Sequence, residues 1–246
     1  MSLKERFFKL GFFYRWIPTK FLMNLAGKKI IYPFYHHIVP TDEDRLTNHI
    51  YKTKNEAEFL QDLRYFKKHF TSLSLKELVA QREDQKDGFF FFLSFDDGLS
   101  NFCKGVTRIL MIEEVSAINF INADFVDNKE LFFRYKMNLL IERLYSNELL
   151  IEQYEAIKRL LKVKKKSIDK LIPKLKSLKE SHNSMVNELC EIAEVDIEDF
   201  LENEKPYMNQ DEIAELIQQG FQIGAHSKSH PYYSELTLKE QLKETE

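Results

Sequence analysis

Glycine is scarce in this chain, which has 7 glycines among 246 residues, whereas average usage predicts about 17. The sequence contains neither G-x-G-x-x-G nor G-x-x-x-x-G-K-[ST], so the usual dinucleotide-binding and P-loop signals are absent. The two cysteines, Cys103 and Cys190, do not form a C-x-x-C pair, which argues against a disulfide framework. We therefore expect a functional site that is built neither from a glycine-rich phosphate loop nor from paired cysteines.

An excess of charge of one sign is also lacking, since 36 Lys and Arg stand against 39 Asp and Glu, a formal net charge of -3. That balance gives no general attraction to nucleic acid, and we predict no nucleic-acid partner. No apolar run is long enough to span a bilayer, and no secretory signal peptide is recognisable. We therefore expect a cytoplasmic or membrane-surface location.

Residues 1–28 are predicted to hold an amphipathic helix that is rich in phenylalanine. Its apolar face has two alternative roles: it packs on the rest of the domain, or it makes a peripheral contact with a membrane.

Residues 29–128 are predicted to form the first part of an α/β domain. The segments 29–35, 89–95 and 117–121 are apolar and short, as in strands that are buried on both faces. Helical patterns separate them, and strands that alternate with helices indicate a parallel sheet.

Capping patterns predict where the helices of this part begin. Thr53 with Glu56, and Ser74 with Glu77, each match a capping box. Ser100 is predicted to cap a third helix, through Leu110.

Residues 129–206 contain no convincing strand and are predicted to be a helical insertion. Pro173 is expected to break or kink one of its helices. The basic stretch 158–179 has two alternative interpretations: it is a solvated helix face, or it is a surface that binds an anionic polymer.

Residues 207–246 resume the α/β pattern. Asn209 and Glu212 cap a predicted helix that stops at Gly220. A strand over 221–225 then leads directly into His226.

Two groups of polar residues follow predicted strands at their C-terminal ends, where α/β folds build their sites. Asp96 and Asp97 follow the strand 89–95, and His226 and His230 follow the strand 221–225. One carboxylate and two imidazoles can form a facial triad that holds a metal and leaves positions open. A second carboxylate beside the metal can act as a general base.

These motifs resemble those of the polysaccharide deacetylase family, also called carbohydrate esterase family 4 or the NodB-homology domain. The sequence from Phe95 to Gly98 resembles the first motif of the family, and the sequence from His226 to His230 resembles the second. Tyr35 to Ile38 resembles the first-strand segment of many members, and residues 50–78 resemble the helical stretch before the first motif.

The resemblance implies a distorted (β/α) barrel, with about seven strands in the complete family fold, which this chain forms incompletely. It implies that Asp96 is the general base, and that Asp97, His226 and His230 hold a divalent metal, usually zinc (Zn²⁺). The substrate would be an N-acetylated glycan or amino sugar, and the products would be acetate and a free amine. A backbone N–H near Leu99 or Ser100 would stabilise the oxyanion.

Four further residues have open roles. His36 and His37 either line the mouth of the site or are structural. Ser227 and Ser229 either bind a ligand or stabilise their loop.

The family motifs expected downstream of the second motif, among them one that carries the general acid, do not occur in this sequence. Two alternatives follow: an active enzyme of which this chain is the N-terminal part, or an inactive relative that binds a glycan or a partner protein. A metal-dependent hydrolase of a different bond, such as an ester, is a third alternative.

Overall fold

The computed structural model of the chain describes residues 16–41, 44–84, 88–146, 148–164 and 168–246. It is a mixed α/β protein in which every pairing between the described strands is parallel, which confirms the predicted class. The strands are β1 (Ile30–Ile31), β2 (Phe34–Tyr35), β3 (Ile38–Val39), β4 (Lys54–Asn55), β5 (Thr71–Ser72), β6 (Phe90–Phe91), β7 (Leu93–Phe95), β8 (Ala117–Ile121) and β9 (Gln222–Ala225).

The main sheet has the order β2-β7-β8-β9. A second sheet has the order β1-β6-β5, and its strands β1 and β6 lead directly into β2 and β7. The interruption between β1 and β2 falls at Pro33, which has no N–H to donate. The ladder nevertheless runs on, because Phe92 N donates to Ile31 O at 3.0 Å and Ser94 N donates to Pro33 O at 3.2 Å. A separate pair, β3 with β4, lies beside this sheet.

In the described part of the chain the main sheet is open, with β2 and β9 as its end strands. The described residues therefore do not close a barrel. The strand number of the complete family fold stays a prediction.

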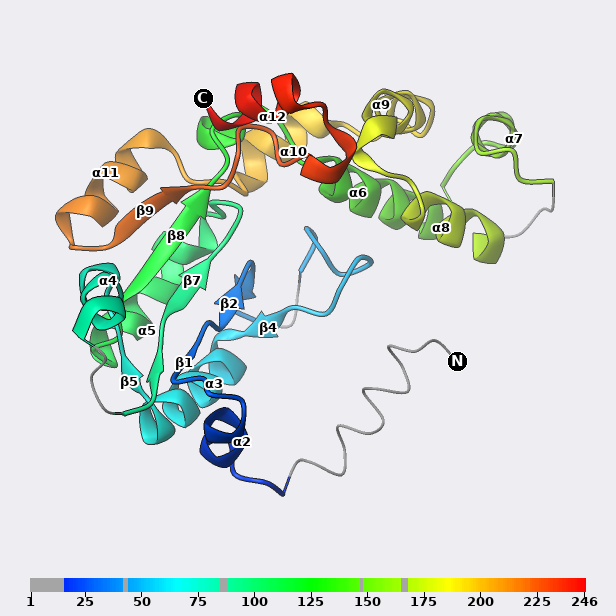
Figure 1. The fold of residues 1–246 in the computed structure, drawn as a ribbon. Helices are drawn as coiled ribbons and strands as arrows, with labels where there is room; N and C mark the ends of the chain where they lie inside the picture. Colours follow the sequence, from blue (N-terminus) through cyan, green and yellow to red (C-terminus); the bar gives the residue numbers. More distant parts are fainter. Residues whose placement is uncertain (1–15, 42–43, 85–87, 147, 165–167) are drawn as a thin grey trace.

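The helices of the sheet part lie around the strands (Figure 1). A short π-helix over Phe102–Val106 leads into the helix that follows β7. The α-helices of this part are α2 (Thr19–Leu25), α3 (Glu56–His69), α4 (Leu75–Asp84), α5 (Thr107–Ile112), α11 (Gln210–Gln218) and α12 (Leu238–Thr245).

Two of the predicted caps are confirmed. Ser74 and Glu77 bond one another at the start of α4, and Asn209 and Glu212 form the capping box of α11. Gly220, with φ +93°, follows the end of α11 as expected.

Two other predicted caps are wrong. The capping box of α3 is made by Asn55 and Glu58 rather than by Thr53 and Glu56, because the Thr53 hydroxyl donates to Asp44 instead. The hydroxyl of Ser100 donates to the carbonyl of Lys205, so it caps no helix.

A first hydrophobic core fills the space between the sheet and α3, α5 and α11. Its fully buried members come from strands and helices alike, such as Phe91 and Leu93 from the sheet, Leu63 from α3 and Leu110 from α5. Burial of each such side chain contributes about 1.5–3 kcal/mol.

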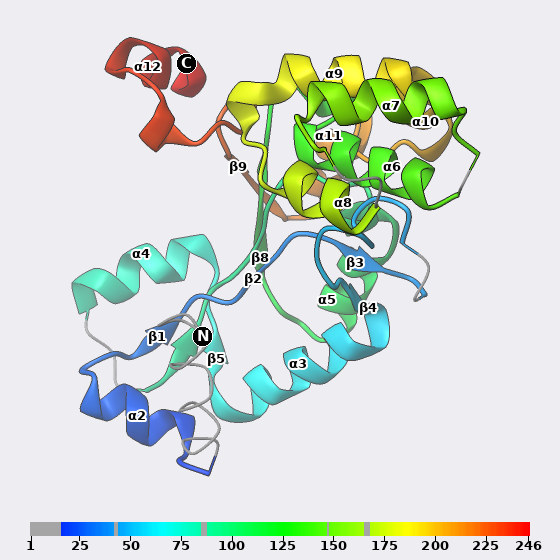
Figure 2. The same ribbon diagram turned by 90° about the vertical axis from the view of Figure 1, so that its right-hand side faces the viewer.

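Residues 129–206 are helical wherever they form regular structure in the described part. They hold α6 (Phe133–Tyr145), α7 (Ile151–Leu160), α8 (Ile168–Lys176), α9 (Asn183–Ile192) and α10 (Ile197–Glu204). Pro173 does not break its helix, since α8 continues to Lys176, and the alternative, a kink at Pro173, stays a prediction. These helices gather in one layer beyond the C-terminal end of β8 (Figures 1 and 2). The boundaries of the proposed domains stay a prediction.

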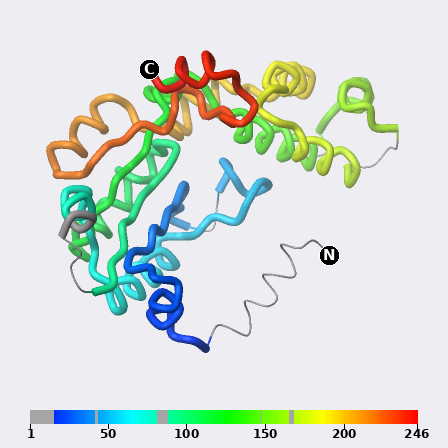
Figure 3. The backbone as a smooth tube through the Cα atoms, in the orientation of Figure 1, coloured from blue at the N-terminus to red at the C-terminus, as the bar shows by residue number. Residues whose placement is uncertain are grey.

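This helical layer has its own hydrophobic core, which includes Leu140 of α6, Leu175 of α8 and Leu189 of α9. Leu99 and Phe125, from the loops after β7 and β8, belong to the same core. The chain leaves the sheet after β8, passes through the helices and returns as β9 at the side of β8 (Figure 3). The helices are therefore anchored on the loops at which the strands end.

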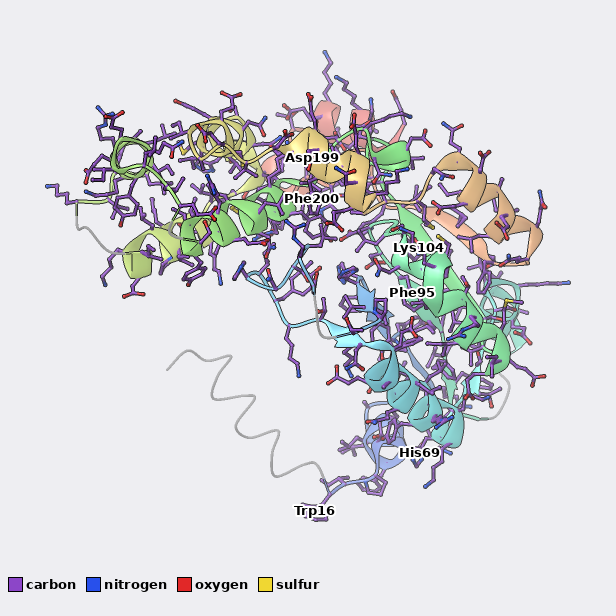
Figure 4. All side chains as sticks on the ribbon, turned by 180° about the vertical axis from the view of Figure 1, so that it is seen from behind. Trp16, His69, Phe95, Lys104, Asp199 and Phe200 are labelled. Atoms are coloured by element: carbon purple, nitrogen blue, oxygen red, sulfur yellow. The ribbon has the colours of Figure 1, made fainter. Side chains whose placement is uncertain are left out.

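Of the predicted N-terminal helix, residues 1–15 lie outside the described residues. In the described part, Trp16 and Leu25 are 79% and 78% exposed, and Trp16 lies at the end of the molecule far from the helical layer (Figure 4). No helix in the described residues is long and apolar enough to cross a membrane. Membrane contact by this segment stays a prediction.

Candidate metal centre

The end of β7 turns sharply and places Asp97 inside the protein. The β2–β7 ladder runs as far as Asp96, whose N–H donates to Tyr35 O at 2.9 Å. Asp97 and Gly98 then adopt φ values of +73° and +68°, a left-handed conformation that Asp tolerates and Gly adopts freely. A Cβ at Gly98 would lie 3.1 Å from Ile121 Cγ2. The turn therefore packs closely on β8, and the Asp97 side chain points inward, with the residue only 4% exposed.

The end of β9 turns in a similar way. His226 N donates to Ile121 O at 2.8 Å and extends the β8–β9 ladder by one bond. Ser227 and His230 then have φ values of +63° and +64°. The turn is closed by His230 N, which donates to Ser227 Oγ at 3.1 Å, and by the Asn122 amide, which donates to the carbonyl of His226.

Both serines of this loop have loop-stabilising contacts. Ser227 accepts the bond from His230 N, and Ser229 donates through its N–H and its hydroxyl to the Glu244 carboxylate of α12 at 2.8 and 2.9 Å. Of the two predicted alternatives, these bonds favour the stabilisation of the loop.

Asp97, His226 and His230 meet at one point. His230 Nε2 lies 3.3 Å from Asp97 Oδ1, and His226 Nε2 lies 3.8 Å from the same oxygen. One ligand atom from each of the three residues lies within 4.8 Å of the others. The two sequence motifs therefore converge at the C-terminal ends of β7 and β9, two parallel strands on either side of β8.

The donor set fits a divalent metal. Asp97 Oδ1 is buried and has no hydrogen-bond partner, although it faces two imidazole nitrogens. A buried polar atom without a partner is costly, and a cation between the three groups would satisfy it. Two imidazoles and one carboxylate, with further positions open, are ligands that Zn²⁺ accepts.

The two neighbouring carboxylates have pKa values that are shifted in opposite directions. Burial raises the pKa of Asp96, and the charge of Asp97 adds to this effect, whereas His226 and His36 act against it. Burial also acts to raise the pKa of Asp97, but the contacts with His230 and the charge of His36 outweigh it and lower that pKa. Divergent carboxylates of this kind are typical of an acid–base pair with different roles.

The two imidazoles differ in the same manner. Burial lowers the pKa of His226. In His230 the effect of burial is outweighed by the close contact with Asp97 and by the negative charge of Asp97, which raise its pKa.

Helix α6 and the residue just before it supply two site residues that the sequence did not reveal. The hydroxyl of Tyr135 donates to Asp97 Oδ2 at 2.9 Å, and the ring of Phe132 lies 4.6 Å from that of His230. Nothing in the spacing of this helix distinguishes them from ordinary core aromatics.

The other candidates are placed as follows. His36 lies near enough to influence the pKa values of Asp96 and Asp97. His37 is buried and has a structural contact with Asp44. The N–H of Ser100 already donates to Pro206 O at 2.8 Å, so it is not a free donor for an oxyanion.

Comparison with known proteins gives partial matches only. No family model matches the chain, and no curated protein matches it. Among solved structures, a de-N-acetylase from Aggregatibacter actinomycetemcomitans is similar at 14% identity over 48% of this chain and 51% of that chain, with a TM-score of 0.35.

Two other solved structures are similar at the same level. The deacetylase PplD from Streptococcus pyogenes, solved in complex with acetate, has 18% identity over 44% of this chain and 49% of its own, with a TM-score of 0.32. The deacetylase domain of BpsB from Bordetella bronchiseptica has 15% identity over 48% of this chain and 50% of its own, with a TM-score of 0.30. The chain thus spans about half the length of the structures it matches. All three are named as deacetylases, and the likeness covers part of each chain only.

Proposed function

We propose that this chain carries the metal site of a carbohydrate de-N-acetylase, a hydrolase that removes the acetyl group from an N-acetylated glycan or amino sugar. The observation that carries the proposal is the convergence of Asp97, His226 and His230, with a second carboxylate, Asp96, beside them. We propose Zn²⁺ as the metal and these three residues as its ligands.

The chemistry divides between the ion and the chain. A divalent ion held by Asp97, His226 and His230 would polarise an amide carbonyl and lower the pKa of a bound water. Asp96 takes the proton from the water that attacks the N-acetyl carbon. The raised pKa of Asp96 suits a general base, because a base works best when its pKa approaches the working pH. The amide C–N bond then breaks, acetate is released, and the nitrogen leaves as an amine after it gains a proton.

The pair Asp96 and Asp97 allows a sharp test. Asp96→Asn should still bind Zn²⁺ but lose about 10²–10⁴-fold in acetate release from N-acetylglucosamine oligomers, since that is the usual contribution of a general base. Asp97→Asn should lose both zinc binding and acetate release. Asp211→Asn, on the exposed first turn of α11, serves as the control and should change neither.

Each failure has a separate meaning. Unchanged acetate release in Asp96→Asn would show that another group is the base. Zinc binding without acetate release favours a glycan-binding relative without activity, and hydrolysis of an aryl acetate ester in place of the amide favours an esterase. A wild-type chain that binds no Zn²⁺ would remove the proposed site.

A further inference from the structure

The two oxygens of the Asp97 carboxylate have different partners. Oδ1 faces the imidazoles of His226 and His230, whereas Oδ2 accepts the hydrogen bond from the hydroxyl of Tyr135 at 2.9 Å. Tyr135 is 1% exposed and Asp97 is 4% exposed. Water therefore does not compete for this bond, and the oxygen that Tyr135 holds is not the one that faces the other ligands.

A carboxylate needs such a partner to keep one orientation. The last torsion of an Asp side chain has a broad energy minimum, so the Asp97 carboxylate can rotate unless one oxygen is held. A tyrosine hydroxyl holds it without a positive charge, and so leaves the negative charge of Asp97 available to a cation. A tyrosine ordinarily has a pKa of about 10, so at neutral pH the hydroxyl is protonated and donates to Asp97 Oδ2.

The backbone around Tyr135 is held in place from two directions. Phe132, one turn earlier, packs on His230 and on the Tyr135 ring, with centroids 4.6 and 5.4 Å apart. Phe132 N donates to the hydroxyl of Tyr207 at 3.1 Å.

Tyr207 is in turn fixed by the loops that follow the strands. Its N–H donates to Asn128 Oδ1 at 2.9 Å, and its carbonyl accepts from the Asn128 amide at 3.1 Å. The next residue, Met208, donates its N–H to Gly98 O at 3.0 Å. The start of α6 is thus bonded, through Tyr207, to the turn that carries Asp97.

We propose that Tyr135 is a positioning residue that orients the Asp97 carboxylate for metal binding, so that helix α6 is a working part of the metal centre. This inference rests on the proposed function, because it assumes that Asp97 is a metal ligand. Partners in this position usually change metal affinity by about 10–100-fold when they are removed.

The test compares two equally buried tyrosines, each 1% exposed. Tyr135→Phe removes the bond to Asp97 and also the contact of the hydroxyl with that of Tyr51. Tyr207→Phe removes the bond from Phe132 N, and Tyr207 does not touch a proposed ligand. The Zn²⁺ dissociation constant is measured by competition with a chromophoric chelator, the Co²⁺ absorption spectrum reports the ligand geometry, and circular dichroism reports the folded fraction.

We expect Tyr135→Phe to bind Zn²⁺ about 10–100-fold more weakly and to show an altered Co²⁺ spectrum. Tyr207→Phe should weaken zinc binding clearly less than Tyr135→Phe does, because it loosens the start of α6 but leaves the bond to Asp97 in place. Both variants should melt at a lower temperature, because each leaves a buried polar group unpaired. If Tyr135→Phe is too unstable at the working temperature, the zinc-induced rise in Tm is compared between the two variants instead.

The outcomes separate the inference from the proposed function. Equal zinc affinity in wild type and Tyr135→Phe would overturn the positioning role while the proposed metal site stands. An equal loss in both variants would overturn it too, because the effect would then belong to the packing in general. A wild-type chain that binds neither Zn²⁺ nor Co²⁺ would overturn the proposed function and this inference together.

Discussion

His37 and Asp44 are buried against each other, with the imidazole Nε2 3.3 Å from the carboxylate Oδ1. The same oxygen accepts from the N–H groups of Leu46 and Thr47 at 2.9 and 3.1 Å, and Oδ2 accepts from the Thr53 hydroxyl at 2.9 Å. Asp44 thus holds together the loop between β3 and β4. Burial alone would raise the pKa of Asp44. The hydrogen bonds from His37 and Thr47 outweigh burial and lower this pKa well below its usual range.

The first prediction concerns stability in acid. Because the folded Asp44 has a lower pKa than the unfolded one, of about 3.9, its contribution is complete above that pH and is lost as the pH falls below it. Asp44→Asn should cost about 2–4 kcal/mol at pH 7, since it breaks a buried and bonded charge. The variant should also lose less free energy of unfolding than wild type when the pH falls from about 4 to about 2. One unit of pKa difference between the folded and unfolded states of a single group corresponds to about 1.4 kcal/mol.

Urea unfolding of wild type and variant across this pH range measures both effects. Glu202→Gln, at an exposed position of α10, is the control and should leave the acid dependence unchanged. If wild type and Asp44→Asn lose stability in parallel as the pH falls, the shifted carboxyl is a different one.

The second prediction uses two glycines in the same backbone conformation. Gly27 and Gly98 have φ values of +62° and +68°, but a Cβ at Gly27 would meet nothing within 4 Å, whereas at Gly98 it would lie 3.1 Å from Ile121. Gly27→Ala should therefore cost only the left-handed penalty of about 1–2 kcal/mol. Gly98→Ala should cost about 1 kcal/mol more, as an overpacked site does. Equal free energies of unfolding for the two variants would show that the turn after β7 yields freely.

The third prediction concerns the two thiols. Burial raises the pKa of Cys103 and of Cys190 to about 12 in each case, and the thiolate is the form that reacts. Iodoacetamide at pH 8 should therefore label neither cysteine of the folded chain within minutes, and should label both in urea, as intact mass will report. Rapid labelling of Cys103 without denaturant would mean that its helix opens frequently.

The fourth prediction concerns the two hydrophobic cores. Leu63→Ala and Leu189→Ala each remove a fully buried side chain, one from each core, and each should cost about 2–5 kcal/mol. Because Leu99 and Phe125 of the sheet part lie in the core of the helical layer, we expect both variants to shift one shared transition. Far-ultraviolet circular dichroism and the near-ultraviolet signal of buried tyrosines such as Tyr135 and Tyr207 should report the same Tm, and two separate transitions in Leu189→Ala would show independent units.

The clustering of Asp97, His226 and His230 was predictable from the sequence because its geometry follows from local rules. Asp97 and His226 each come just after an apolar run that forms a parallel strand, and parallel strands bring their C-terminal ends to one edge. The position of each motif along its strand thus already contains most of the spatial information.

The contribution of α6 was not predictable in this way. Tyr135 and Phe132 approach the site only because the helical layer packs on the loops after β7 and β8. This packing is a tertiary contact, which the spacing of apolar residues along the sequence does not reveal. The capping errors have a similar cause. Thr53 and Ser100 had acceptors outside their own helices, Asp44 and the Lys205 carbonyl, and those acceptors bound their hydroxyls instead.

The route of the chain from β8 through the helices to β9 has a consequence for the order of assembly. Asp97 is synthesised long before His226 and His230, and the whole helical layer lies between them in the sequence. Contacts of such long separation form late, because the cost of closing the intervening chain must be met first. A metal held by all three residues would therefore bind tightly only to chains whose helical layer has already docked, and zinc uptake during refolding would measure the last step of folding rather than the first.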